Sequence, residues 1–210
     1  EHSKKLEFIL KSLKTESISF HASYRYFRLT CSDEKWDLME NDFKKSIEIC
    51  KEHNGEFLVL HTNEGLPGEV MDKGILEKRI QKLIKLGKEK EVKVVIENVG
   101  IGKNILYNQE EYIELIKKYN FDSLIDIGHA IANNWDLDKV ITELKENIIA
   151  YHFHNNDGEK DLHKSIYDGK ADYERIISLV KENTPEANIV LEYSAATPKR
   201  EILETLEKLS

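Results

Sequence analysis

Cysteine, proline and long apolar runs are scarce in this 210-residue chain, and each scarcity excludes a class of protein. Cys31 and Cys50 are too few to hold a domain of this size together by disulfides, so we expect reduced thiols and a cytoplasmic protein. The apolar runs are short, whereas a membrane-spanning helix needs about 20 consecutive apolar residues, so no membrane partner is expected. The N-terminal residues Glu1 to Lys5 contain no apolar signal region.

An excess of basic charge and the common nucleotide and nucleophile motifs are also missing. The formal net charge is −8, which disfavours general binding to nucleic acid because contacts to phosphates depend on basic side chains. The sequence contains no Walker-type phosphate loop and no Gly-x-Ser-x-Gly nucleophile motif. Gly100-Ile101-Gly102 lacks the third glycine of a dinucleotide-binding loop. The chemistry must therefore come from other residues.

Short apolar runs alternate with segments of helical periodicity along the chain. The runs are nearly continuous and rich in β-branched or aromatic residues, as in buried parallel strands. We expect strands at Ser17–Phe20, Phe57–Leu60, Val92–Ile96, Ser123–Ile127, Ile148–Phe153 and Asn188–Leu191. A helical segment at Leu6–Leu13 precedes the first of them. This alternation predicts an α/β fold with a parallel sheet, in a single domain over residues 1–210.

The number of strands indicates an incomplete barrel. A closed TIM barrel has eight βα units and typically runs to about 250 residues. Six units are visible here, so we expect a TIM (β/α) barrel that lacks its first two units. Such a barrel has open sheet edges, which a second copy of the chain could cover in a homodimer. Either the chain is a fragment or the barrel is natively incomplete.

Each predicted strand carries a histidine or an acidic residue within one residue of its C-terminal end. These residues are His21, His61, Glu97, Asp126, His154 and Glu192. In a parallel barrel the carboxyl ends of the strands meet at one mouth, so we expect one shared site. Carboxylates forced together raise one another's pKa unless a cation neutralises them, and carboxylates with histidine suit a divalent metal. His152 shares the inward face of its strand with His154, and we expect it one layer deeper, as a structural residue or a support for the site.

The order of these segments resembles the xylose isomerase-like barrel superfamily, which holds sugar and sugar-phosphate isomerases and epimerases together with endonuclease IV. The resemblance covers nearly the whole chain, and its most specific part is the histidine-rich segment with the glycine loop that follows. The segments that carry it are HASY at 21–24, LVLH at 58–61, VVIEN at 94–98, DIGHA at 126–130, HFHNNDGEKDLH at 152–163, YDGKADY at 167–173 and VLEYS at 190–194.

The resemblance implies a metal site at the mouth. In the epimerase members one divalent ion, Mn²⁺ or Zn²⁺, would be held here by Glu97, Asp126, His154 and Glu192. The two glutamates would flank the substrate carbon and pass a proton. The multi-zinc pattern of endonuclease IV also finds matching residues. His21 and His61 would complete one metal site with Glu97, and another would be formed by His129, Asp161 and His163. In a one-metal enzyme His21, His61, His129, Asp161 and His163 would bind substrate instead.

Three functions follow from this resemblance. We expect first a metal-dependent isomerase or epimerase of a sugar or sugar phosphate. The second is an endonuclease IV-like zinc phosphodiesterase acting on abasic DNA, with Tyr24, Arg25 and Arg28 as the local candidates for DNA contacts. The third is a metal-binding barrel without catalysis, which the missing units favour. Arg25, Lys103 and Lys164 are the candidates for contact with a substrate phosphate.

The sequence departs from the family pattern in two places besides the missing units. Thr62 and Asn63 stand where a proline is frequent, and Asn155 stands where an aspartate is common. These changes put the local loop contacts to substrate in doubt, but they remove none of the metal-ligand candidates.

Overall fold

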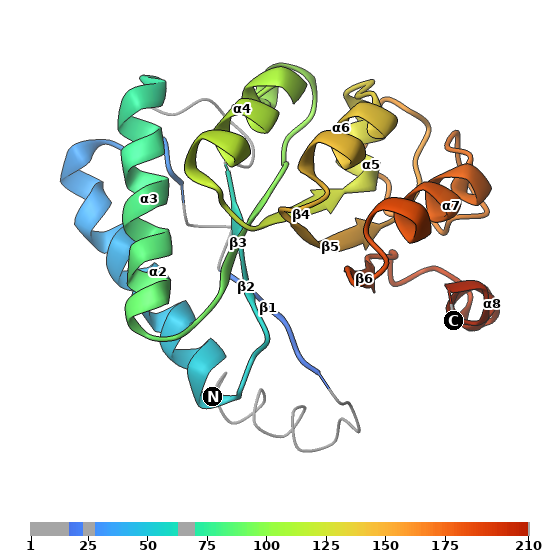
Figure 1. Ribbon diagram of the computed structural model, residues 1–210, viewed down its shortest axis with the longest axis horizontal. Coiled ribbons are helices and arrows are strands. Elements are labelled where there is room, and N and C mark those ends of the chain that lie inside the picture. Colours follow the sequence, from blue (N-terminus) through green and yellow to red (C-terminus); the bar gives the residue numbers. More distant parts are fainter. Residues whose placement is uncertain (1–16, 23–27, 63–69, 210) are drawn as a thin grey trace.

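The computed structural model describes residues 17–22, 28–62 and 70–209, which form one six-stranded parallel sheet with helices along its outer side (Figure 1). The predicted incomplete α/β TIM barrel is confirmed as a half-barrel of six strands in chain order. The strands are β1 (Phe20–His21), β2 (Leu58–His61), β3 (Val94–Glu97), β4 (Ser123–Asp126), β5 (Ile148–Phe153) and β6 (Asn188–Leu191). The helix predicted at Leu6–Leu13 lies outside the described residues.

The helices follow an arc around the convex side of the sheet, and the strands lie inside that arc (Figure 1). None of the helices in the described ranges is long and apolar enough to cross a membrane. A short 3₁₀ turn, η1 (Gly102–Asn104), lies between β3 and the next helix. The α-helices are α2 (Asp33–Glu52), α3 (Lys73–Glu89), α4 (Gln109–Tyr119), α5 (Ile127–Ala132), α6 (Leu137–Leu144), α7 (Tyr173–Asn183) and α8 (Lys199–Leu209).

Alternation along each strand separates two apolar layers. Side chains facing the helices form the larger core, which includes Leu60, Ile96 and Phe153. Side chains on the concave face form a smaller cluster of Phe57, Val59, Val95, Leu124 and Ala150. Since side chains two residues apart share a face, the next concave positions along the strands lie just above this small cluster. We call this small apolar cluster the floor, because it lies directly below the polar residues of the candidate site.

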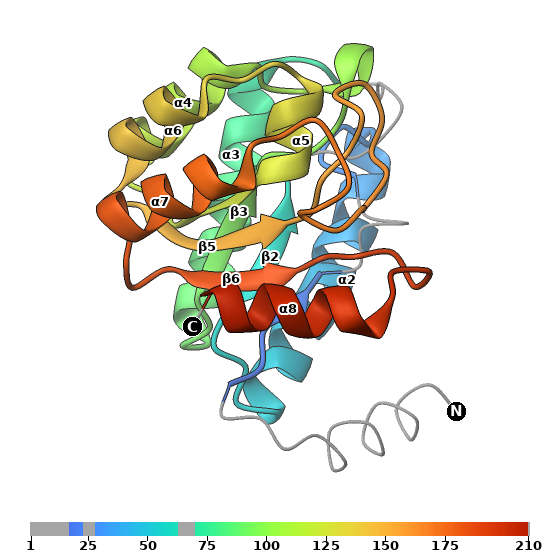
Figure 2. The same cartoon turned by 90° about the vertical axis from the view of Figure 1, so that its right-hand side faces the viewer.

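The half-barrel is curved enough for its two halves to touch at the amino ends of the strands. Asn188 Nδ2, at the start of β6, donates to Glu56 Oε1 at 2.8 Å, two residues before β2 begins. Figure 2 shows the loop between β5 and α7 and the loop after β6 extending from the opposite end of the sheet. That end, where the carboxyl ends of the strands converge, is the mouth.

Tyr112 fastens helix α4 to the two strands that carry the most deeply buried carboxylates. Its hydroxyl lies 2.8 Å from the Ile96 carbonyl, to which it donates, and 2.8 Å from Ser123 Oγ. Tyr112 and Ser123 are both fully buried, so neither hydroxyl can turn to water instead. The contact therefore holds α4 against β3 and β4 directly below the site.

We predict that Tyr112→Phe lowers the free energy of unfolding by about 1–3 kcal/mol, because it removes the buried hydroxyl that bonds the Ile96 carbonyl and Ser123 Oγ. Urea unfolding monitored by circular dichroism measures the loss. Tyr119→Phe is the matched control on the same helix. Its hydroxyl bonds the half-buried Glu77, which also pairs with Lys118, so its loss is expected to be smaller, below about 0.5 kcal/mol. Equal losses in the two variants would contradict the role given to Tyr112.

Candidate metal centre

The mouth gathers the histidines and carboxylates that end the strands. His21, His61, Glu97 and Asp126 are the last residues of β1, β2, β3 and β4. Glu192 directly follows β6, and its backbone N–H bonds to the Phe153 carbonyl of β5. The sequence prediction that strand ends deliver one cluster is therefore confirmed in the placement of these residues.

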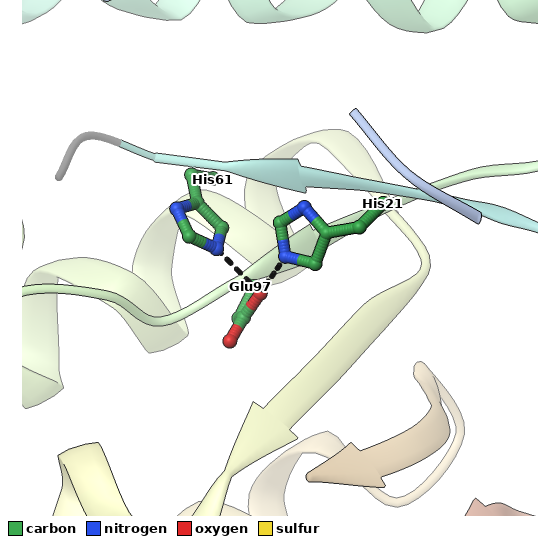
Figure 3. Close-up of side chains that lie close together, drawn as sticks. All are labelled: His21, His61 and Glu97. Carbon is green, nitrogen blue, oxygen red and sulfur yellow. Dashed lines mark hydrogen bonds and ion pairs between the residues drawn. The ribbon is translucent and has the colours of Figure 1, made fainter. Parts of the chain in front are cut away.

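Glu97 lies at the centre of this cluster and is 1% exposed. Its Oε2 lies 3.2 Å from His21 Nε2 and 3.0 Å from His61 Nε2, as Figure 3 shows. Its Oε1 lies 3.1 Å from His152 Nδ1. Burial opposes ionisation of Glu97, but the charges of His61 and His152 hold its pKa well below the usual range. The two oxygens of one ionised carboxylate thus serve two different sets of histidines.

Glu97 is shared by two groups of ligand candidates. The edge group consists of His21, His61 and Glu97. The central group consists of Glu97, Asp126, His152 and Glu192. Within each group the ligand atoms all lie within 4.8 Å of one another. In the central group His152 Nδ1 is 3.2 Å from Glu192 Oε2 and 3.7 Å from Asp126 Oδ2. Nitrogen and carboxylate oxygen donors at this spacing suit Mn²⁺ or Zn²⁺.

His152 and His154 lie in different layers of the mouth. The ligand set predicted from the sequence, Glu97, Asp126, His154 and Glu192, stays a prediction, and the structure brings His152 close to its three carboxylates as well. The reason is the strand register, which pairs Asp126 with His152, so that His152 lies level with the carboxylates. Strand β5 ends at Phe153, and His154 therefore lies one layer further toward solvent, at the start of the next loop.

His154 is one of four residues of the outer group, together with His129, Asp161 and His163. Asp161 Oδ2 lies 3.1 Å from His163 Nε2 and 3.4 Å from His129 Nε2, so these three predicted partners do meet. The ligand atoms of His154, Asp161 and His163 lie within 4.8 Å of one another, as do those of Asp126, His129 and His154.

Backbone carbonyls orient two histidines of the outer group. His129 Nδ1 lies 3.0 Å from the Asn98 carbonyl, and His163 Nδ1 lies 2.9 Å from the Glu192 carbonyl. A carbonyl only accepts, so the Nδ1 atoms carry the protons and the Nε2 atoms face Asp161. Histidines that bind metals are commonly held in this way.

Protonated histidines balance the buried carboxylates of the metal-free protein. Burial opposes the charged form of His129, but the charge of Asp126 and the bond to Asp161 raise its pKa to about 10. The bond to Asp161 raises the pKa of His163 to about 9. Among the described residues, the ion pairs of Glu97 and Asp126 are all with histidines. A divalent cation could replace these protons, so the donor set fits a metal.

Asn98 is a site residue that the strand-end pattern did not single out. Its side-chain Nδ2 donates to the Asp126 carbonyl at 3.0 Å, and its Oδ1 accepts from the Asp126 N–H at 2.7 Å. The side chain thereby extends the pairing of β3 with β4 beyond the last strand hydrogen bonds. Its signal in the sequence is the position directly after Glu97 in the segment VVIEN.

The predicted phosphate and DNA contacts gain little support. Tyr24 and Arg25 lie outside the described residues, and Arg28 and Lys103 are exposed. Lys164 pairs with Asp168 at 3.0 Å, which offsets its charge. The described residues therefore offer no cluster of basic side chains at the mouth.

We predict that chelated, metal-free protein loses stability as the pH rises. The pKa values of His129 and His163 are raised above about 6.5, so they contribute stability below that pH and lose it as the pH passes about 9 to about 10. Urea unfolding in the presence of a chelator, across this pH range, measures the decline. His163→Asn should make the decline shallower, and parallel curves for the two proteins would contradict the assignment.

The sequence matches the xylose isomerase-like TIM barrel family over residues 3–210. An uncharacterized protein, MJ1311 of Methanocaldococcus jannaschii, is 24% identical over 152 residues, which are 70% of this chain and 50% of that protein. The chain thus spans about half the length of this curated relative.

Solved structures share the fold. A D-tagatose 3-epimerase-like protein superposes with a TM-score of 0.79 at 21% identity, covering 98% of this chain and 80% of the other. The TTHB071 protein of Thermus thermophilus, soaked with ZnCl₂, gives 0.76 at 15% identity, covering 100% and 84%. Endonuclease IV from Thermus thermophilus gives 0.70 at 18% identity, covering 91% and 74%. The chain belongs to the xylose isomerase-like TIM barrel family.

Proposed function

We propose that this chain is a metal-dependent hydrolase of phosphate esters on sugars, with more than one divalent cation at its mouth. The observation that carries the proposal is the position of Glu97. One of its oxygens faces His21 and His61, and the other faces His152, so a single carboxylate joins two donor groups. A site for one cation needs no such bridge, whereas phosphoester hydrolysis uses neighbouring cations on the attacking and leaving oxygens.

In the proposed hydrolase, Glu97, Asp126 and Glu192 have different roles. Glu97 fixes the spacing between the edge group and the central group, and Asp126 connects the central group to the outer group. The Glu192 side chain is 37% exposed, so it can exchange a proton with solvent during the reaction. Bound cations, Mn²⁺ or Zn²⁺, would lower the pKa of a coordinated water and offset charge on the phosphoryl oxygens.

Both a small sugar phosphate and the sugar–phosphate backbone of abasic DNA contain a phosphate ester on a sugar. Endonuclease IV, which shares the fold, supports the second possibility. The net charge of −8 and the pairing of Lys164 with Asp168 favour a small substrate, because binding to DNA depends on contacts from basic residues. We propose a cytoplasmic location, because two cysteines in 210 residues are too few to hold a domain of this size together by disulfides. A homodimer that covers the edges of β1 and β6 stays a prediction.

A sugar isomerase or epimerase with one cation is the second candidate. Glu97 and Glu192 both approach His152, at 3.1 and 3.2 Å, so two carboxylates lie on one central group as proton transfer between faces of a carbon requires. The D-tagatose 3-epimerase-like neighbour supports this candidate. It ranks second because three histidines occupy the oxygens of Glu97, which lowers its pKa and makes it a weak base.

Counting cations distinguishes the two enzymes. We predict that the purified protein, loaded with Zn²⁺ or Mn²⁺, holds more than one cation per chain by elemental analysis. His163→Ala should lower that number by one and reduce hydrolysis of p-nitrophenyl phosphate, of bis-p-nitrophenyl phosphate or of an abasic duplex by more than about 100-fold. His53→Ala removes a histidine at the C-terminal end of α2, away from the mouth, and should change neither quantity.

A different cation count and a different reaction would contradict the hydrolase. One cation per chain in both the wild-type protein and His163→Ala, with solvent deuterium entering a ketose and no phosphoester cleaved, would replace the hydrolase by the isomerase. Protein that binds cations but catalyses neither reaction would favour the non-catalytic barrel.

A further inference from the structure

Tyr193 directly follows Glu192, and its hydroxyl joins the loop after β5 to helix α8. The hydroxyl oxygen accepts from the Ile166 N–H at 3.1 Å and lies 3.1 Å from Thr205 Oγ1. Thr205 Oγ1 donates its own proton to the Glu201 carbonyl at 2.7 Å. Because a hydroxyl has only one proton, the Tyr193 hydroxyl is the donor to Thr205. One side chain thus bridges the loop and the helix.

The residues on either side of Tyr193 bind the same loop. The Ser194 N–H donates to the His163 carbonyl at 2.7 Å, and the Glu192 carbonyl accepts from His163 Nδ1 at 2.9 Å. Three consecutive residues of the chain therefore hold the loop by three hydrogen bonds, two at His163 and one at Ile166. We call these three hydrogen bonds the clasp.

His163 needs the clasp because its backbone is strained. Its φ of 48° lies in the left-handed region, which a residue with a Cβ atom keeps only when its surroundings hold it there. The clasp fixes both the carbonyl and the ring of His163 in this conformation. Its Nε2 then lies 3.1 Å from Asp161 Oδ2 in the outer group. If the clasp loosens, His163 can relax its backbone and turn away from Asp161.

Helix α8 is the base to which the clasp is attached. Thr205 on α8 is fully buried, so the partner of the Tyr193 hydroxyl is held by packing. Ser165 in the loop is also buried, and its Oγ donates to Glu201 on the same helix. The loop that carries His163 is consequently tied to α8 by two neighbouring contacts, one of which passes through Tyr193.

We propose that Tyr193 is a positioning residue, which through the clasp holds His163 in the outer group and beside Glu192. The Glu192 side chain meets His152 at the mouth, whereas the Tyr193 side chain meets α8, so one short segment connects the site to its support. The hydroxyl acts through the backbone of its neighbours. The proposal rests on the cation sites of the proposed function, but not on the reaction catalysed there.

Titration of the chelated protein with Zn²⁺, followed by isothermal calorimetry, tests the proposal without substrate. Tyr193→Phe keeps the ring but removes the hydroxyl, so Ile166 loses its acceptor and Thr205 its donor. We expect the Kd of the cation site that His163→Ala abolishes to rise about 10-fold or more, while the other sites keep their Kd. Thr205→Val removes the support of the hydroxyl from the other side and should raise the same Kd.

Tyr151→Phe is the matched control. Tyr151 also pairs a buried hydroxyl with a threonine, Thr184, at 2.8 Å, but its side chain lies in the larger core between sheet and helices. The substitution should lower the Tm and leave every Kd unchanged. A double-mutant cycle adds a second control. In protein that already carries His163→Ala, Tyr193→Phe should not weaken cation binding further, because the residue that it positions is gone.

Several results would overturn the proposal. An unchanged Kd in Tyr193→Phe, or an equal change in Tyr151→Phe, would leave Tyr193 with a role in folding alone. A further loss of affinity when Tyr193→Phe is added to His163→Ala would show that it does not act through His163. If Tyr193→Phe does not fold, Thr205→Val decides, and an unchanged Kd in that variant contradicts the proposal. A wild-type protein that binds no divalent cation would instead overturn the proposed function, and the proposal with it.

Discussion

The structure depends on keeping two buried carboxylates ionised. Glu97 is 1% and Asp126 is 0% exposed, and transfer of such charges out of water costs several kcal/mol for each ion unless partners compensate. Histidines supply that compensation from strands β1, β2 and β5, from helix α5 and from the loop after β5. The cluster is consequently a shared electrostatic unit, and the fold must hold every strand end in register for any one carboxylate to remain charged.

The architecture meets this demand through a parallel sheet whose strands end at a common level. The larger core between sheet and helices holds the strands from outside, and contacts such as Tyr112 with Ile96 and Ser123 hold individual strands beside one another. Asn98 continues this bracing at the mouth by pairing with the backbone of Asp126. Tyr112, Ser123 and Asn98, which brace the strands around the buried carboxylates, are thus neutral.

Much of the fold and the site was predictable because both depend on local patterns. Continuous apolar runs and helical spacing fix the elements, and the residue at each strand end is read directly from the sequence. The choice between His152 and His154 was not predictable in this way. His152 on β5 and His154 directly after it are two residues apart and share the concave face, and only the register of Asp126 with His152 decides which is level with Glu97. The double hydrogen bond of Asn98 also needs coordinates, since an asparagine after a strand has many possible partners.

The apolar floor affects how water and ions reach the two buried carboxylates. Within the described part of the chain, Phe57, Val59, Val95, Leu124 and Ala150 close the concave side below the carboxylates with side chains that carry no polar atoms. This floor separates Glu97 and Asp126 from the amino ends of the strands, whereas Asp161, His163 and Glu192, each about a third exposed, lie on the opposite side of the site. Solvent exchange with the two buried carboxylates is therefore expected from the side of the mouth, where these three side chains can exchange protons with water.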